Sequence, residues 1–235
     1  MTRSTVIKLV VESPLSLRGE GRGSLQEVLK VPIYAKDGLK YWPIIPATSI
    51  KGAFRGITEL LGSSIGSGSD DPRRKLMASH KRERGKISHI FDIDALLNEI
   101  GPREREFLER IGERGSDYLE YLACPICRLF GAPGVAAKVR FSDAIPSSEP
   151  VLRQMTRTSI DRKSMKVKEE RLFTEELVVS GEFRFVIVVD DLDSLEEELF
   201  NNVLTYLGEE GLQLGGGKSI GRGRMKVYIG PWENR

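Results

Sequence analysis

The 235-residue sequence has only two cysteines and two histidines, so it offers few soft ligands for a metal. Cys124 and Cys127 form a single C-x-x-C pair, which can be half of a zinc site, a redox pair or a buried turn. The spacing of this pair from His80 and His89 matches no standard zinc finger. A redox pair would open a helix after a strand, whereas this pair follows an amphipathic helical stretch. We therefore expect a structural pair, with no metal and no cofactor.

Long apolar runs and a large net charge are also missing. No segment is long enough to cross a membrane and no signal peptide is visible, which favours a cytoplasmic protein. The formal net charge is +2, so any affinity for nucleic acid must come from clustered basic residues. Asparagine and glutamine are sparse while 30% of residues are charged, as is typical of thermophiles. The length and the 40% hydrophobic content fit one domain over 1–235.

The densest mixture of glycine and basic residues lies close to the C-terminus. A loop of this kind can hold phosphate with backbone N–H groups and cationic side chains. Gly217-Lys218-Ser219 resembles the end of a P-loop, but Leu212 stands where the first glycine is required. Alternation over 225–229 then predicts a strand instead of a helix. A nucleotide cradle is disfavoured, and a glycine-rich turn or a phosphate site remain open. The loop contains Gly215, Gly216, Gly217, Lys218, Gly221, Arg222, Gly223 and Arg224.

The periodicity along the chain predicts an α+β fold. Strands are expected at 5–11, 137–142, 183–189 and 225–229, and helices from Thr48 or Ser49 to Leu61 and from Asp193 or Ser194 to Gly208. Their order is βαββαβ, a ferredoxin-like arrangement. No RNP-type aromatic pattern accompanies it, so stacking of RNA bases on the sheet is not supported. A Gly/Ser linker at 62–68 opens an expected helical insertion over 62–121, and 31–41 is expected to be irregular.

Basic residues gather in three further places. Arg18 and Arg22 lie in a flexible loop at 13–23. Lys51 and Arg55 share one face near the start of the first helix with Ser49, where free N–H groups and the helix dipole favour an anion. The stretch 151–173 is either a solvated hairpin or an arm that contacts nucleic-acid backbone and wedges apolar side chains between bases. Its candidate contacts are Arg157, Arg162, Lys163 and Lys166.

Several of these segments resemble, in order, the motifs of CRISPR-associated RAMP proteins. I-P-A-T-S-I-K-G-A-F-R at 45–55 resembles I-P-G-S-S-L-K-G-x-x-R, and C-P-I-C-R-L-F-G at 124–131 resembles C-P-x-C-x-L-F-G. V-R-F-S-D-A at 139–144 is similar to the R-F-S-D-A strand of the family. The segments 159–162 and 171–176 are similar to I-D-R…L-F-x-x-E, and the glycine loop to the C-terminal signature. The subgroup most resembled is the Cas7-like, Csm3-like backbone subunit of type III effector complexes.

This resemblance implies a fold, partners and contacts. It implies an RRM-derived palm, a β-hairpin thumb over 151–173 and head-to-tail assembly along a guide RNA. The partners would be crRNA, target RNA and other Cas subunits, including Cas10-type and Cas5-like ones, in antiviral defence. Guide contacts would come from Ser49, Lys51 and Arg55 of the motif helix and from the glycine loop, while the thumb would displace a guide–target base pair.

The sequence departs from the Csm3-like pattern at the cleavage site. Those subunits cut target RNA with an aspartate before the motif helix, and the aligned position falls near Lys30 or Val31. Asp37 is the candidate that remains, with Glu27 nearby. We therefore expect an RNA-binding subunit that does not cut. The alternatives are an endoribonuclease that uses Asp37 and Mg²⁺, Cas6-type processing, which His80 and His89 do not favour because they lie in the insertion, and a scaffold without direct RNA contact.

Overall fold

The computed structural model describes residues 2–22, 25–35, 38–71, 73–74, 77, 123–132, 135–160 and 167–234. Within these ranges the side chains of 18, 20–22, 35, 158–160 and 167–173 are not described. Most of the predicted insertion over 62–121 falls outside the described residues. So do Asp37, His80, His89 and three predicted RNA contacts, Arg162, Lys163 and Lys166.

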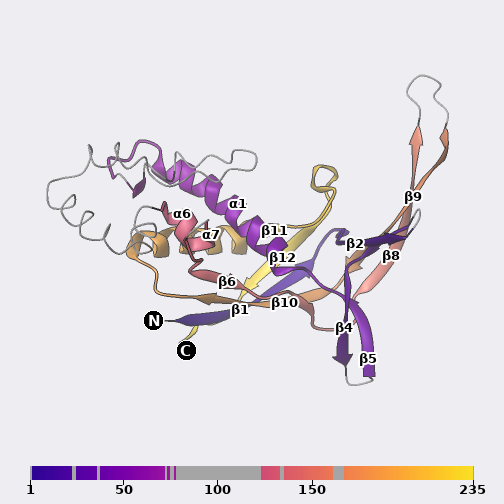
Figure 1. The fold of residues 1–235 in the computed structure, drawn as a ribbon, viewed down its shortest axis with the longest axis horizontal. Coiled ribbons are helices and arrows are strands. Elements are labelled where there is room, and N and C mark those ends of the chain that lie inside the picture. The colour runs from indigo at the N-terminus through magenta and orange to yellow at the C-terminus, as the bar shows by residue number, and fades with distance from the viewer. Residues whose placement is uncertain are drawn as a thin grey trace.

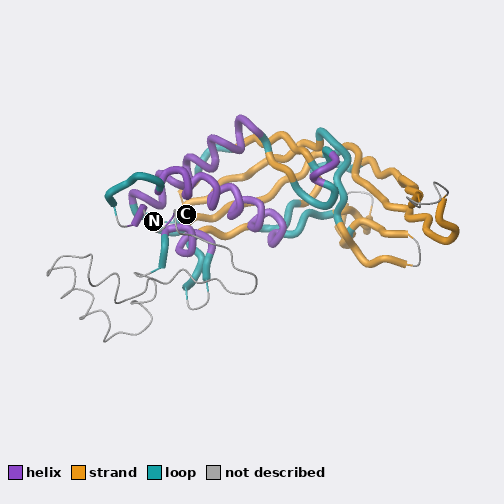
Figure 2. The backbone as a smooth tube through the Cα atoms, turned by 90° about the horizontal axis from the view of Figure 1, so that it is seen from above, coloured by secondary structure: helices purple, strands orange, loops and turns teal. Residues whose placement is uncertain are grey.

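A seven-stranded antiparallel sheet forms the centre of the fold (Figure 1). Its order is β11-β12-β1-β10-β6, with β13 beside β1 and β7 beside β10. Because β13 pairs with the start of β1, the two termini lie side by side (Figure 2). The strands are β1 (Arg3–Val11), β6 (Val139–Phe141), β7 (Ile145–Pro146), β10 (Glu182–Val189), β11 (Leu212–Gln213), β12 (Arg224–Ile229) and β13 (Glu233–Asn234).

One face of this sheet carries the core, because alternate residues of each strand point to the same side. Ile7 and Leu9 of β1 and Phe183, Phe185 and Ile187 of β10 are buried. The predicted strands at 5–11, 183–189 and 225–229 are confirmed, together with the α+β class.

In the described part of the chain, three helices cover the core face: α1 (Ala47–Gly66), α6 (Pro125–Phe130) and α7 (Ser194–Glu210) (Figures 1 and 2). Phe54 of α1 packs against Phe141 and Phe185 of the sheet, with ring centroids 5.0 and 6.2 Å apart. The linker predicted from Gly62 is wrong at its start, since α1 continues to Gly66. A Cβ on Gly62 would lie 3.0 Å from Ile126 Cδ1, so this glycine lets α6 approach the helix closely. In the described part of the chain, no helix is long and apolar enough to cross a membrane.

The start of α1 and the end of α7 differ from the prediction, whereas the start of α7 agrees with it. The N-cap of α1 is Pro46, not Thr48 or Ser49, and Asp143 Oδ1 accepts the Ala47 N–H at 2.7 Å. The N-cap of α7 is Asp193, as predicted, in a capping box with Glu196. That helix passes Gly208 and ends before Gly211, whose φ of +78° suits a helix end.

A second sheet, of order β2-β3-β9-β8, extends away from the central sheet (Figure 1). The long hairpin of β8 (Val151–Ile160) and β9 (Val167–Ser180), named the arm below, occupies the predicted basic stretch and continues beyond it. β3 (Leu25–Val28) pairs in parallel with β9. β2 (Arg18–Arg22) pairs with β3, so part of the loop expected at 13–23 is a strand.

The segment expected to be irregular at 31–41 is a β-hairpin of β4 (Lys30–Ala35) and β5 (Gly38–Pro43). Gly38 has a φ of +108° beside the turn. Tyr34 and Tyr41 lie on one face of the hairpin and are exposed. Apolar residues occupy both faces of this hairpin, including the exposed face. The sequence therefore lacks the alternation of polar and apolar residues that would predict these strands.

Candidate nucleic-acid interface

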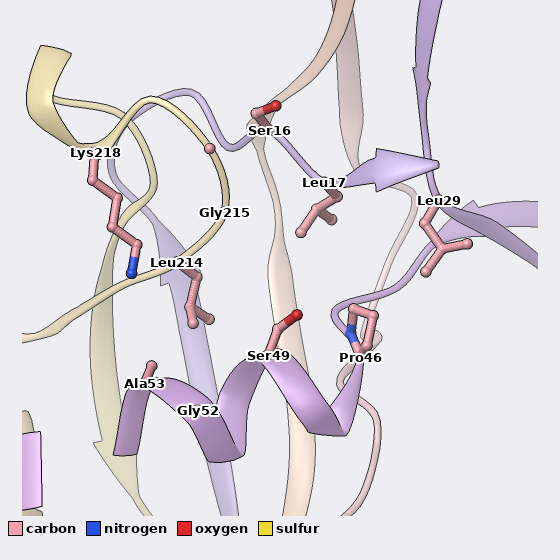
Figure 3. A pocket seen from close by; sticks show the side chains of 11 residues that line it. Ser16, Leu17, Leu29, Pro46, Ser49, Gly52, Ala53, Leu214, Gly215 and Lys218 are labelled. Carbon is pink, nitrogen blue, oxygen red and sulfur yellow. The ribbon is translucent and has the colours of Figure 1, made fainter. Parts of the chain in front are cut away.

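Four segments of the chain line a groove of about 530 Å³ (Figure 3). The first turns of α1 form one wall through Ser49, Gly52 and Ala53. The glycine loop, residues 214–224, forms the opposite wall, and Ser16, Leu17 and Leu29 line the remaining side. The structure thus brings together four of the predicted contact residues, Ser49, Gly215, Gly216 and Lys218.

The shape of this groove depends on two close backbone approaches. Gly215 has a φ of +77°, and a Cβ there would lie 2.2 Å from the carbonyl oxygen of Ser16. The next residue, Gly216, donates its N–H to the same oxygen at 3.1 Å. At the other end of the loop, the Gly223 N–H donates to Pro14 O at 3.0 Å. The loop is therefore fixed against 14–16, and only glycine fits at the first contact.

A second groove of about 710 Å³ continues along α1. It shares Gly52, Ala53 and Lys218 with the first groove and reaches Leu60 of α1 and Tyr206 of α7. A Cβ placed on Gly52 or Gly56 would have no heavy atom within 4 Å among the described residues, so the helix surface is open here. The two grooves form a continuous path across α1 past Lys218.

Two of the predicted basic residues are available to a ligand in this path. Lys218 is exposed, and within the described residues it makes no ion pair. Its side chain runs toward α1 across the groove (Figure 3). Arg224 lines the second groove with its side chain 65% exposed, and its Nε lies 3.3 Å from Glu12 Oε2. Lys51 is half-buried beside Gly52 and lines neither groove.

Arg55 does not support the predicted phosphate contact, because its side chain is engaged within the chain. The side chain is 11% exposed, and its Nε lies 3.0 Å from Glu59 Oε1. Its Nη1 donates to the carbonyl oxygen of Gly131 at 3.0 Å. Arg55 therefore joins α1 to the end of α6.

A comparison with models of protein families identifies the family of this chain. A model of the RAMP superfamily matches residues 22–226. The chain belongs to the RAMP superfamily. Its fold is similar to that of a chain from a "Type IV-B CRISPR Complex", with a TM-score of 0.59 and 16% sequence identity, over 97% of this RAMP chain and 90% of the other. No curated protein sequence matches it.

Arg157, Arg18 and Arg22, three further basic candidates of the RAMP chain, lie on the second sheet, whereas Arg222 lies in the glycine loop. Arg157 is exposed on the arm, and its Nε lies 3.7 Å from Glu175 Oε2. Arg18 and Arg22 lie at the two ends of β2. Arg222, predicted to hold RNA, is buried and pairs with the same Glu175 carboxylate as Arg157.

Sequence reasoning missed two contributors to the groove. Gly52 leaves the α1 wall of the groove open, and Asp143 accepts a hydrogen bond from the first N–H group of α1. Asp143 belongs to the R-F-S-D-A segment, and the neighbouring Ala144 exchanges two backbone hydrogen bonds with Ile45 of the helix motif, at 2.8 and 3.1 Å. The R-F-S-D-A segment and the helix motif therefore contact each other beside the groove. Their resemblance to family motifs was the signal in the sequence that could have pointed to Gly52 and Asp143.

The cysteine pair forms the start of α6. Cys124 is its N-cap, and its Sγ accepts the Cys127 N–H at 3.4 Å. A side-chain hydrogen bond with Cys127, together with burial, raises the pKa of the Cys124 thiol well above its usual range. The thiol is therefore neutral and acts as a helix cap. The described residues contain no group of three or more histidine, cysteine, aspartate or glutamate side chains placed to hold a metal.

Proposed function

We propose that this RAMP chain is an RNA-binding backbone subunit of a CRISPR effector complex. The groove between α1 and the glycine loop would hold the phosphate backbone of crRNA. The observation that carries this proposal is the convergence of the motif helix and the glycine loop on one open groove beside Lys218, which makes no ion pair among the described residues. The fold likeness to a chain of a Type IV-B CRISPR Complex supports membership of such an assembly. Assignment to type III and to the Csm3-like subgroup rests on the motif resemblance.

The proposal extends to the architecture. Strands β12, β1, β10 and β6 would form a ferredoxin-like palm, because they occur in the chain as βαββαβ together with α1 and α7. The arm would be the thumb that contacts the guide–target duplex. Head-to-tail assembly as a homo- or hetero-oligomer, in a complex that includes Cas10-type and Cas5-like subunits, would then place target RNA beside the guide. Contacts of this kind read phosphate and shape and not base sequence.

We propose that the subunit holds RNA without cutting it. The position aligned with the cleaving aspartate of Csm3-like proteins falls near Lys30 or Val31, and Lys30 Nζ is 2.9 Å from Glu176 Oε1. This lysine joins β4 to the arm, so its side chain has a structural contact. No cofactor is required for binding, and Mg²⁺ would be needed only for cleavage.

Lys218→Gln tests the proposed groove. Loss of one phosphate contact to single-stranded RNA should weaken binding and lower the slope of log K against log salt concentration by about 0.7. The measurement is a fluorescence-anisotropy titration of labelled crRNA at several salt concentrations. Lys226→Gln is the matched control, because Lys226 is an exposed lysine that lies over the Tyr228 ring and lines neither groove. Equal slopes for Lys218→Gln and the wild type would rule out a phosphate contact at Lys218.

Gly52→Leu tests the groove by blocking it. The leucine replaces a helical glycine that has open space above it, so α1 should become more stable by roughly 0.5–1 kcal/mol. Its side chain would fill the part of the path shared by both grooves, and we expect at least about a tenfold loss of RNA affinity, or 1.4 kcal/mol. Gly208→Leu is the control, because Gly208 is an exposed helical glycine of α7 with open space around it. Unchanged RNA affinity in a stabilised Gly52→Leu protein would place the RNA elsewhere.

A further inference from the structure

Arg222 is a buried arginine that directly follows an exposed turn of the glycine loop. It is 6% exposed, whereas 217–221 are all exposed. Its N–H donates to Gly217 O at 3.2 Å, and its carbonyl oxygen accepts Gln213 Nε2 at 2.9 Å. The backbone of this residue is therefore held inside the loop, and its side chain points away from the solvent in which RNA would bind.

The side chain of Arg222 crosses to the arm. Its Nη1 donates to Glu175 Oε2, and its Nη2 lies 3.1 Å from Met155 Sδ. Met155 of β8 and Glu175 of β9 are opposite each other in the register of the hairpin. Glu175 is also opposite Gln26 of β3. One guanidinium thus joins the glycine loop to both strands of the arm, about midway along the hairpin.

This connection and the shape of the loop depend on each other. A Cβ on Gly217 would lie 2.9 Å from Arg222 Cδ, so the arginine side chain passes directly beneath Gly217. Gly217 and Gly221 both have positive φ, at +75° and +78°, and form the turn that precedes Arg222. Removal of the carboxylate from a buried ion pair strongly destabilises the protein, because the guanidinium is left as an uncompensated buried charge. Glu175 is therefore the partner on which the connection depends most.

We propose that Arg222 is a positioning residue that links the glycine loop to the arm and makes no contact with RNA phosphate. The link keeps the groove wall and the arm in one fixed arrangement, which lowers the cost of ordering them when RNA binds. The statement about phosphate rests on the function proposed above, whereas the link itself does not. The geometry reassigns Arg222 from RNA ligand to internal support.

Hydrogen exchange on the RNA-free protein tests the link. In Arg222→Gln and in Glu175→Gln, amides of the loop at 214–223 and of the arm at 152–157 and 174–178 should exchange at least about tenfold faster, because a buried ion pair is broken. Arg224→Gln removes an exposed arginine two positions away and should leave the arm unchanged. The double variant should exchange no faster than either single variant, because both remove the same interaction. Faster exchange in the loop alone would overturn the proposal.

The salt dependence of crRNA binding tests the second part of the proposal, that Arg222 makes no contact with RNA phosphate. Arg222→Gln should keep the slope of the wild type, because no phosphate contact is lost. A slope reduced as in Lys218→Gln would show a phosphate contact at Arg222 and overturn the proposal. Failure of the wild type to bind RNA would refute the proposed function, while the exchange result would still decide the link. If Arg222→Gln does not fold, Arg222→Met replaces it in both measurements, because it also removes the charge and its apolar side chain suits a buried position.

Discussion

Replacing Glu196 with alanine should lower the free energy of unfolding by about 3–5 kcal/mol, the cost of removing one partner from a buried ion pair. Glu196 is fully buried in the first turn of α7. Its Oε1 lies 2.7 Å from Arg128 Nε, and its Oε2 lies 3.0 Å from Lys138 Nζ. The same Oε2 accepts the Asp193 N–H at 2.9 Å in the capping box. Loss of this carboxylate would leave two mostly buried cations without their central partner.

Two further variants separate the contributions in urea unfolding. Glu196→Gln retains an acceptor for the Asp193 N–H but no charge, so it should keep the cap and lose the ion pairs. Glu198→Ala removes a neighbouring exposed glutamate that pairs with Arg74 at 2.6 Å, and we expect a loss of about 1 kcal/mol or less. Equal losses for Glu196→Ala and Glu198→Ala would show that the buried cluster contributes no more than a surface pair.

The sequence predicts those elements of the RAMP chain whose signal is local. Alternation in β1 and β10 predicts one buried face, and Asp193 followed by Glu196 predicts the start of α7. The structure agrees at both places, with Ile7 and Leu9 buried and the capping box formed. The hairpin of β4 and β5 lacks such a signal, because Tyr34 and Tyr41 put apolar side chains on its exposed face.

Charge partners are the part that could not be predicted from local pattern. The spacing of Lys51 and Arg55 places both on one face of α1, but it does not show that the carbonyl oxygen of Gly131, 76 positions later, engages the arginine. Likewise the basic glycine loop gives no indication that Arg222 meets Glu175, which lies 47 positions earlier. Such pairs depend on the packing of distant strands, so they follow from tertiary structure and not from propensity.

The motifs that resemble the RAMP family nevertheless contained this information in another form. Ile45 of the helix motif pairs with Ala144 of R-F-S-D-A. Glu175 of the L-F-T-E-E segment pairs with Arg222 of the glycine loop, and its neighbour Glu176 pairs with Lys30. The segments therefore support one another around the groove, which is a physical reason for them to occur together in one chain.

Gly223→Ala should destabilise the protein by about 3 kcal/mol, combining the strain of a positive φ with overpacking. Gly223 has a φ of +77°, and a Cβ there would lie 1.8 Å from the carbonyl oxygen of Leu214. Its own carbonyl oxygen accepts the Leu214 N–H at 2.9 Å, so the clash falls on a hydrogen-bonded pair that closes the loop. Thermal unfolding and the crRNA titration measure the loss of stability and of binding in the same variant.

Gly221→Ala is the matched control, because it isolates the backbone strain from the clash. Gly221 has a φ of +78°, but a Cβ there would have no heavy atom within 4 Å among the described residues. Alanine at this position should therefore cost only about 1–2 kcal/mol of left-handed strain and leave the wall formed by Gly215 and Gly216 in place. We expect Gly223→Ala to lose crRNA binding and Gly221→Ala to retain most of it. Comparable losses in both would mean that flexibility of the loop, and not its closed geometry, determines how the groove holds RNA.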